Sequence, residues 1–333
     1  MTNQPAPPPP RAPTTTTTTH ITTLGNEPFP TPAQLSQATK THRQGAFAIT
    51  TRKLPISKAG PIEAMEAALR IPVPEMIFGD NLVAVEHGPS GWAIAFTAQD
   101  ALDGVDKTGT QGLLQVAHAR SWAASRENAG DTKAIMEVVR PFDWSYSTGY
   151  RGSVRAGSST STGTSTIPTN STANNTSSTT TPNTNGSTEE GKKLDFAPTT
   201  KPIPLELLKR RDPILFFDEV VLYESELDDN GVSLLSAKVR VHEQRMLLLC
   251  RLFMRVDGVV VRVRDVRVYV DFEAEDVTRE YTAREGAFED ARRALLMTGL
   301  RPDEITIALR DANKIAELLP IVEQTLESVS LKS

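Results

Sequence analysis

The second half of the chain alternates apolar and polar side chains over long stretches, and this alternation predicts antiparallel β-strands. Every second residue from Leu235 to Val241 is apolar, which is the period of a strand that buries one face. Asn230-Gly231 and Asp257-Gly258 suit the positive φ angles of tight hairpin turns. The pattern predicts a meander of four strands over residues 214–224, 235–242, 246–256 and 259–270.

Two of these strands depart from simple alternation. Residues 214–224 carry apolar side chains on both faces, so we expect both sides to be covered. In residues 259–270 the apolar positions change parity, from Val259, Val261 and Val263 to Val266, Val268 and Val270. A β-bulge near Arg264-Asp265 would absorb the extra residue, and a break between two strands would explain the pattern equally well.

The first half of the chain has shorter signals of the same kinds. Residues 47–50 resemble a strand, and residues 61–69 a helix with Pro61 in its first turn. A Gly-containing loop between residues 82–85 and 92–96 predicts a hairpin. Helical spacing predicts further helices at residues 101–102, 116–123, 205–208, 287–296 and 313–326, the last two covering one face of the sheet.

Two segments lack the large apolar residues that a core requires. Residues 1–44 are rich in Pro and Thr, and residues 153–196 are rich in Ser, Thr and Asn, so both are predicted to be disordered. Residues 45–152 supply too few strands to close a core without residues 197–333. We therefore predict one composite α+β domain, with a mainly antiparallel β-sheet core of hairpin plus meander and short helices packed on it.

The net charge and the cysteine count limit the function. A net charge of −5 with a pI of about 5.7 recruits neither nucleic acid nor an anionic membrane. Cys250 is the only cysteine, which excludes an internal disulfide and is typical of a reducing compartment. No signal peptide or membrane span is evident, so we expect a cytoplasmic protein, or one that is also nuclear.

Catalytic and metal-binding motifs do not emerge from the sequence. None of the five histidines stands at metal-ligand spacing from another or from Cys250, and the glycine-rich and nucleophile motifs are missing. Acidic clusters such as Asp218-Glu219 leave a metal-dependent hydrolase as an alternative, although neighbouring strand residues point to opposite faces. We therefore expect no enzyme activity and no cofactor.

Arginine recurs between residues 251 and 293, interleaved with acidic residues and with Tyr269, Phe272 and Tyr281. This interleaving differs from the basic stripe of a nucleic-acid-binding protein. Arginine pairs with carboxylates inside folds and across interfaces, and surfaces rich in Arg and Tyr are typical of protein-binding sites. Internal ion pairs and a protein-binding surface both remain open.

Several motifs in a shared order make the chain similar to the TIPRL family, also called the TOR signalling pathway regulator family. The similarity runs from about Phe47 to Val329. The motifs are Pro74-Glu75-Met76-Ile77-Phe78-Gly79-Asp80-Asn81, Pro141-Phe142-Asp143-Trp144-Ser145-Tyr146-Ser147-Thr148, Phe216-Phe217-Asp218-Glu219-Val220, Leu227-Asp228-Asp229-Asn230-Gly231-Val232-Ser233, Arg255-Val256-Asp257-Gly258 and Arg279-Glu280-Tyr281-Thr282-Ala283-Arg284-Glu285.

The resemblance implies a non-catalytic regulator in TOR signalling that binds the catalytic subunits of type 2A and related protein phosphatases. A passive scaffold or chaperone for phosphatase subunits is the related alternative, and participation of a Tap-family phosphatase adaptor stays open. In such proteins a groove beside the sheet takes the extended C-terminal tail of the phosphatase. The resemblance places Asp100 and Tyr281 on that surface, together with Val263 and Ile203.

A peptide tail that ends in a carboxylate needs apolar pockets and a cation for its terminus. Arg279 and Arg284 flank Tyr281 in the sequence, so we expect one of them to bind the carboxylate. Binding is then predicted where Asp100 meets the bulged strand and Tyr281, with both disordered segments dispensable.

Overall fold

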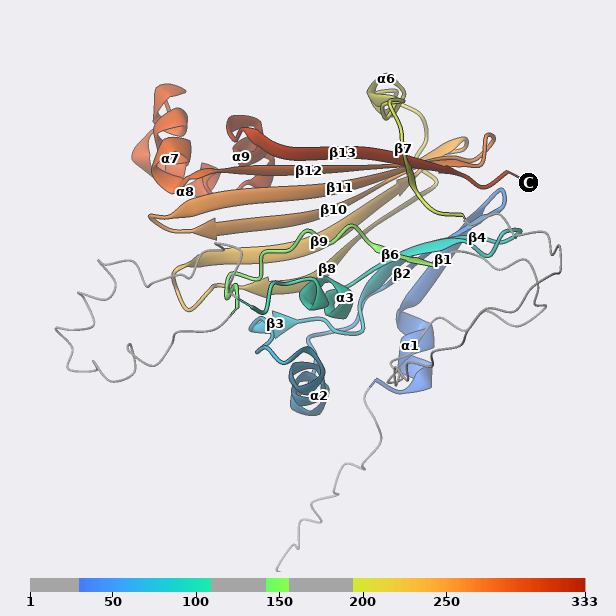
Figure 1. Cartoon of the computed structure of the whole chain (residues 1–333), viewed down its shortest axis with the longest axis horizontal. Helices are drawn as coiled ribbons and strands as arrows, with labels where there is room; N and C mark the ends of the chain where they lie inside the picture. The colour runs from blue at the N-terminus through green and yellow to red at the C-terminus, as the bar shows by residue number, and fades with distance from the viewer. Residues whose placement is uncertain (1–29, 109–141, 156–193, 333) are drawn as a thin grey trace, which may run out of the picture.

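A computed structural model of the protein describes residues 30–108, 142–155 and 194–332. It contains two antiparallel sheets and short helices. The large sheet has the strand order β3-β8-β9-β10-β11-β12-β13-β7, and the small sheet has the order β1-β2-β4-β5-β6. Figure 1 shows the small sheet below the large one, with helices α6 to α9 on the opposite side. The predicted single α+β domain is confirmed.

The large sheet contains the predicted meander as β8 to β11, and β12, which the sequence patterns did not predict, continues it, so that β8 to β12 follow one another along the chain and pair as neighbours. Its strands are β3 (Met76–Ile77), β7 (Ala197–Pro198), β8 (Phe216–Ser225), β9 (Gly231–Val241), β10 (Arg245–Val256), β11 (Val260–Asp271), β12 (Asp276–Ala287) and β13 (Ile321–Ser330).

The small sheet includes the predicted hairpin of β4 and β5. Its strands are β1 (Thr39–Gln44), β2 (Phe47–Arg52), β4 (Leu82–His87), β5 (Ala93–Thr97) and β6 (Ser153–Arg155). The described helices are α1 (Pro32–Ala38), α2 (Ala59–Leu69), α3 (Ala98–Asp103), α6 (Leu205–Leu208), α7 (Phe288–Met297), α8 (Pro302–Ala308) and α9 (Ala312–Leu318). None of these helices is long and apolar enough to cross a bilayer.

The main core lies between the two sheets, and we call the side of the large sheet that faces it the inner face. Val85 and Ile94 of the small sheet and Leu248 and Val268 of the large sheet are fully buried in one cluster, where each contributes roughly 1.5–3 kcal/mol by leaving water. Asp218 on β8 also joins the sheets, because it accepts a hydrogen bond from Thr51 Oγ1 at 2.7 Å.

A second core lies on the opposite, outer face of the large sheet. Helices α7, α8 and α9 cover one end of that face, as Figure 1 shows. Phe253 of β10 and Val261 and Val263 of β11 pack beneath them, against Leu295 of α7 and Ile315 of α9. The expectation that C-terminal helices cover one face of the sheet is therefore confirmed.

Strand β11 has no bulge, so the predicted irregularity near Arg264-Asp265 is wrong, as is the alternative of a broken strand. Every residue from Val260 to Asp271 pairs in one register with both neighbouring strands. The parity changes because Val261 and Val263 pack under the helices on the outer face, whereas Val266, Val268 and Val270 pack against the small sheet on the inner face. Register shifts occur instead between Val221 and Tyr223 of β8 and between Ala283 and Arg284 of β12.

Both segments predicted to be disordered were given bounds that are too wide, because the structure orders residues at their ends. Residues 32–44 form α1 and β1, because Thr31 and Gln34 make a capping box and β1 pairs with β2. Residues 153–155 form β6 on β5, and Phe196 packs against Trp92 at a ring distance of 5.9 Å. The rest of both predictions, and the predicted helix at residues 116–123, lies outside the described residues.

Two further predictions fail near the edges of the large sheet. The helix predicted over residues 313–326 ends at Leu318, and after Pro320 the chain forms β13, which pairs with β12. Sequence periodicity also missed α8. Strand β8 is not covered on both sides throughout, because Phe217 on the outer face stays half exposed.

Residues 199–215 form a strap that connects β7, at one edge of the large sheet, with β8 near the other edge. Arg245 of β10 donates a hydrogen bond to the Leu207 carbonyl at 2.7 Å and pairs with Asp212. Ile203, a residue of the strap, is buried. The strap thus covers the end of the outer face that helices α7 to α9 leave open.

The first residue of β9, Gly231, provides a test of backbone packing. Gly231 has φ +156°, and a Cβ there would lie 1.8 Å from the Arg255 carbonyl oxygen. Gly231→Ala should therefore lower the free energy of unfolding by about 3 kcal/mol or more. In the matched control Gly258→Ala, φ is +72° with no atom within 4 Å, so only about 1–2 kcal/mol of left-handed strain is expected. Equal losses in urea unfolding would contradict this account.

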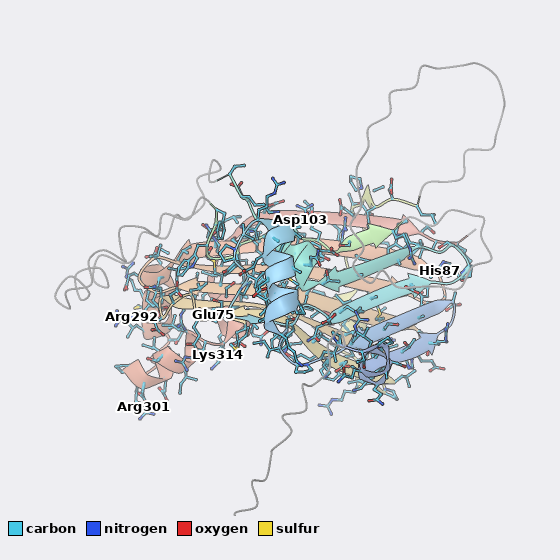
Figure 2. All side chains as sticks on the ribbon, turned by 90° about the horizontal axis from the view of Figure 1, so that it is seen from below. Glu75, His87, Asp103, Arg292, Arg301 and Lys314 are labelled. Carbon is cyan, nitrogen blue, oxygen red and sulfur yellow. The ribbon has the colours of Figure 1, made fainter. Side chains whose placement is uncertain are left out.

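His87 lies at one end of the small sheet (Figure 2), buried beside Phe47. Its Nδ1 is 2.7 Å from Ser90 Oγ, and its Nε2 is 3.6 Å from a Glu275 carboxylate oxygen. Burial lowers the pKa of His87, and the Glu275 charge offsets this only in part. The folded state therefore binds this proton less readily than the unfolded chain does.

The pKa of His87 is lower in the folded state than in the unfolded chain. The free energy of unfolding should therefore be unaffected by His87 above about pH 6.5 and should decrease as the pH falls below that value. His87→Gln should flatten this part of the pH dependence, since glutamine does not titrate. Urea unfolding between about pH 5 and pH 7.5 measures both proteins. Parallel stability curves for the two proteins would rule out His87 as the source.

Candidate functional site

Residues 142–155 join the two sheets across the inner face. Residues 142–148 are all buried, and the Tyr223 hydroxyl of β8 donates a hydrogen bond to the Tyr146 carbonyl at 3.2 Å. After Gly149 the chain becomes partly exposed and enters β6. We call residues 148–155 the bridge segment, because it contacts the residues expected to form the site from both sides.

On one side, the bridge segment holds Asp100. The Asp100 carboxylate accepts a hydrogen bond from Ser153 Oγ at 2.5 Å, while Thr97 caps the start of α3. The Tyr150 hydroxyl lies 3.0 Å from the same Ser153 oxygen and donates to the Ala95 carbonyl. Burial raises the pKa of Tyr150 well above its usual value, so the phenol stays protonated. Asp100 itself is exposed and held at a defined place.

On the other side, the bridge segment covers Tyr281 of β12. The Arg151 guanidinium carbon lies 4.4 Å from the centre of the Tyr281 ring, an attractive stacking geometry. Tyr281 is only 2% exposed, and burial raises its pKa. Arg151 also forms an ion pair with Glu323 of β13 at 2.6 Å. Tyr281 is thus a support beneath Arg151, and Arg151 presents the accessible charge.

Arg279 lies on the same face as Tyr281 but is fully engaged. It pairs with Glu327 of β13 at 2.6 Å and donates to the Arg151 carbonyl at 3.2 Å. Its guanidinium carbon lies 4.0 Å from the centre of the Phe196 ring. Arg279 therefore fixes the backbone of the bridge segment.

The structure separates the remaining predicted residues from this cluster. Val263 and Arg284 are directly opposite each other in the β11–β12 register and lie on the outer face, where Val263 is buried under the helices. Ile203 is buried in the strap. Arg284 is half-buried, and within the described ranges it makes no hydrogen bond or ion pair. It stands three residues after Tyr281, and side chains of a strand alternate, so the two point to opposite faces.

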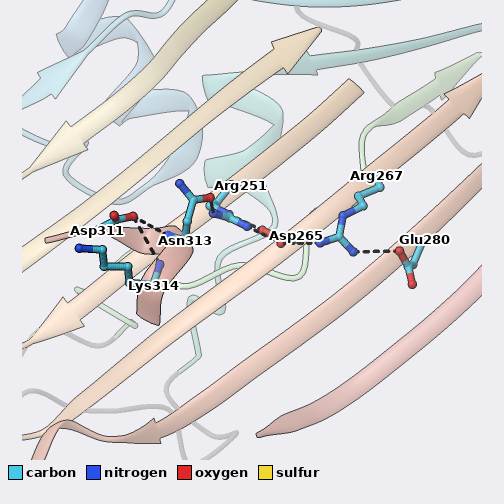
Figure 3. Close-up of polar contacts among 7 residues, drawn as sticks. All are labelled: Arg251, Asp265, Arg267, Glu280, Asp311, Asn313 and Lys314. Atoms are coloured by element: carbon cyan, nitrogen blue, oxygen red, sulfur yellow. Dashed lines mark hydrogen bonds and ion pairs between the residues drawn. The ribbon is translucent and has the colours of Figure 1, made fainter. Parts of the chain in front are cut away.

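The outer face between the strap and α9 carries a connected network of ion pairs (Figure 3). Arg251 binds Asp265 with two hydrogen bonds of 2.7 and 2.8 Å and reaches Asn313 of α9 at 2.7 Å. Arg267 bridges Asp265 and Glu280. Internal ion pairs, one of the two interpretations of the arginine-rich region, therefore account for Arg251, Arg255, Arg262, Arg267, Arg279, Arg292 and Arg293.

The acidic pair Asp218-Glu219 divides between the two faces, as strand alternation predicts. Burial alone would raise the pKa of Asp218, but hydrogen bonds from Lys53 and Thr51 hold it below its usual value. Glu219 pairs with Lys238 at 2.9 Å on the outer face. In the part of the chain that the structure describes, no group of three or more His, Cys, Asp or Glu side chains could hold a metal ion.

Sequence reasoning missed Tyr150, Arg151, Ser153 and Phe196. The first three directly follow the motif at residues 141–148, which was a usable signal. Phe196 lies at the end of a polar stretch that indicated disorder. Its contact with Arg279 depends on the return of the chain to β7.

Comparisons with known proteins agree with the motifs noted above. A family model described as TIP41-like family matches residues 76–292. A TIP41-like protein of Homo sapiens is 35% identical over 286 residues, covering 86% of this chain and 87% of that protein. The type 2A phosphatase activator TIP41 of Saccharomyces cerevisiae is 30% identical over 296 residues, covering 85% and 72%.

A third relative is the type 2A phosphatase activator tip41 of Schizosaccharomyces pombe, 26% identical over 280 residues, which cover 84% of this chain and 94% of that protein. Because the family model matches more than half of the chain and the relatives align over most of it, the chain belongs to the TIP41-like family.

Proposed function

We propose that this protein is a non-catalytic regulator that binds the catalytic subunit of type 2A protein phosphatases. The observation that carries the proposal is the family membership, since two relatives are named type 2A phosphatase activators. A role in TOR signalling, in the cytoplasm or nucleus and with or without a Tap-family adaptor, belongs to the same proposal.

The proposed binding surface is the bridge segment with Asp100. An extended C-terminal tail would lie along Asp100 and along Gly149 and Arg151, which lie next to Tyr281. Its carboxylate would meet Arg151, because Arg279 is held by Glu327 and Phe196 and Arg284 lies on the other face. The Arg151–Glu323 pair is partly exposed, and pairs of that kind contribute only about 0–1 kcal/mol, so Arg151 can exchange partners.

This proposal predicts how a synthetic peptide of the phosphatase tail should bind to the full chain. Arg151→Ala should weaken binding by about 10-fold to 100-fold, because a charge-assisted hydrogen bond contributes about 1.5–3 kcal/mol. Arg284→Ala is the matched control and should bind as the parent protein does. Isothermal titration calorimetry measures all three proteins.

A peptide with an amidated C-terminus separates the carboxylate from the rest of the tail. Amidation should weaken binding to the parent protein and have little further effect on Arg151→Ala. Equal affinity of the free and amidated peptides for the parent protein would exclude a carboxylate site. Failure of the full catalytic subunit to bind the folded parent protein would overturn the proposed function itself.

A passive scaffold would give a different result in activity measurements. A regulator changes the rate of dephosphorylation by the catalytic subunit when it is added in excess, whereas a scaffold leaves the rate unchanged. For a scaffold, the parent protein and Arg151→Ala would differ in binding, but neither would change the rate of dephosphorylation.

A further inference from the structure

Three large apolar residues lie close together in the chain where the strap enters β8. Ile214, Leu215 and Phe217 are 51%, 48% and 53% exposed. The segment is ordered, because the Leu215 amide donates to the Val241 carbonyl at 2.9 Å and the Pro213 carbonyl lies 3.0 Å from His242 Nδ1. Contiguous exposed apolar residues on a rigid surface mark an interaction site more often than isolated ones do.

Three exposed arginines lie close to this apolar group in the sequence or in the strand register. Arg240 of β9 is directly opposite Phe217 in the strand register, and Arg210 and Arg211 precede Ile214 in the strap. All three are exposed. Among the described residues none of them forms an ion pair or a side-chain hydrogen bond, unlike the arginines of the network in Figure 3.

The acidic side chains around this group are mostly committed elsewhere. Asp212 pairs with Arg245, Glu219 with Lys238, and Glu206 with Lys209. Glu243 in the β9–β10 turn is the exception. Arg211 and Arg240 therefore lie near the apolar group without an acidic partner among the described residues, and Arg210 is close enough to Asp212 for its charge to act on that carboxylate, in a chain whose net charge is −5.

We propose that Ile214, Leu215, Phe217, Arg210, Arg211 and Arg240 form a docking surface for a partner protein's segment in which acidic residues alternate with apolar ones. The apolar side chains would leave water against Phe217 and its neighbours, and the carboxylates would pair with the arginines, which suit them by fork geometry. This surface is at the strap end of the outer face, away from the bridge segment, and does not depend on phosphatase binding.

The test uses the full chain and a fluorescein-labelled, capped peptide in which glutamate alternates with leucine and phenylalanine. The peptide should bind, more weakly at high salt. The triple variant Arg210→Glu, Arg211→Glu and Arg240→Glu should weaken binding by about tenfold or more. The triple variant Arg292→Glu, Arg293→Glu and Arg310→Glu, at the other end of the same face, makes the same change in net charge and should bind normally.

A second variant tests the apolar part without changing the charge. Leu215→Ser with Phe217→Ser should also lose binding, while thermal unfolding confirms that each variant is folded. No binding of the acidic peptide, or equal binding to both arginine variants, would overturn the proposal. It would also be overturned if the surface took phosphatidylserine vesicles or a second copy of this chain, seen by sedimentation, in place of the peptide.

Discussion

The uninterrupted pairing of β10, β11 and β12 is the constraint on which the rest of the molecule depends. A strand in continuous register cannot rotate its side chains from one face to the other. The small sheet covers the inner face at one end and the C-terminal helices cover the outer face at the other, so the apolar residues themselves must change parity. The same three strands therefore contribute side chains to both cores. Where one face of a strand packs in a core, the opposite face at that end is free for polar contacts.

Local signals in the sequence located the elements whose partners are near in the chain. The β4–β5 hairpin, α2, α7 and the turns at Asn230 and Asp257 follow from periodicity and turn chemistry. Other elements were missed or misassigned. Residues 39–44 have little apolar character, yet they pair with the neighbouring strand β2, and His42 stacks on the distant Phe216 at 5.5 Å. Residues 321–326 have helical spacing, but Pro320 stops the helix and the open edge of β12 takes them as a strand.

The candidate site was predictable to the extent that strand parity determines it. Arg279 lies two residues from Tyr281 and must share its face, whereas Arg284 lies three residues away and cannot. Counting residues along the strand would therefore have shown which of the two arginines lies on the same face as Tyr281. Strand counting could not find Arg151, because its position over Tyr281 follows from how residues 142–155 cross the inner face. The motif at residues 141–148 marks the segment next to Arg151 but does not specify that path.

The energetics of the ion pairs separate residues that build the site from residues that can meet a partner. A ligand carboxylate that took Arg279 would leave Glu327 partly buried without its cation, and unpaired charges away from water are costly. It would also loosen the Arg151 carbonyl, which Arg279 holds. A carboxylate that took Arg151 would release only Glu323, which is exposed and returns to water. The strand residues Tyr281 and Arg279 thus hold the bridge segment in place, and the replaceable charge belongs to the bridge segment itself.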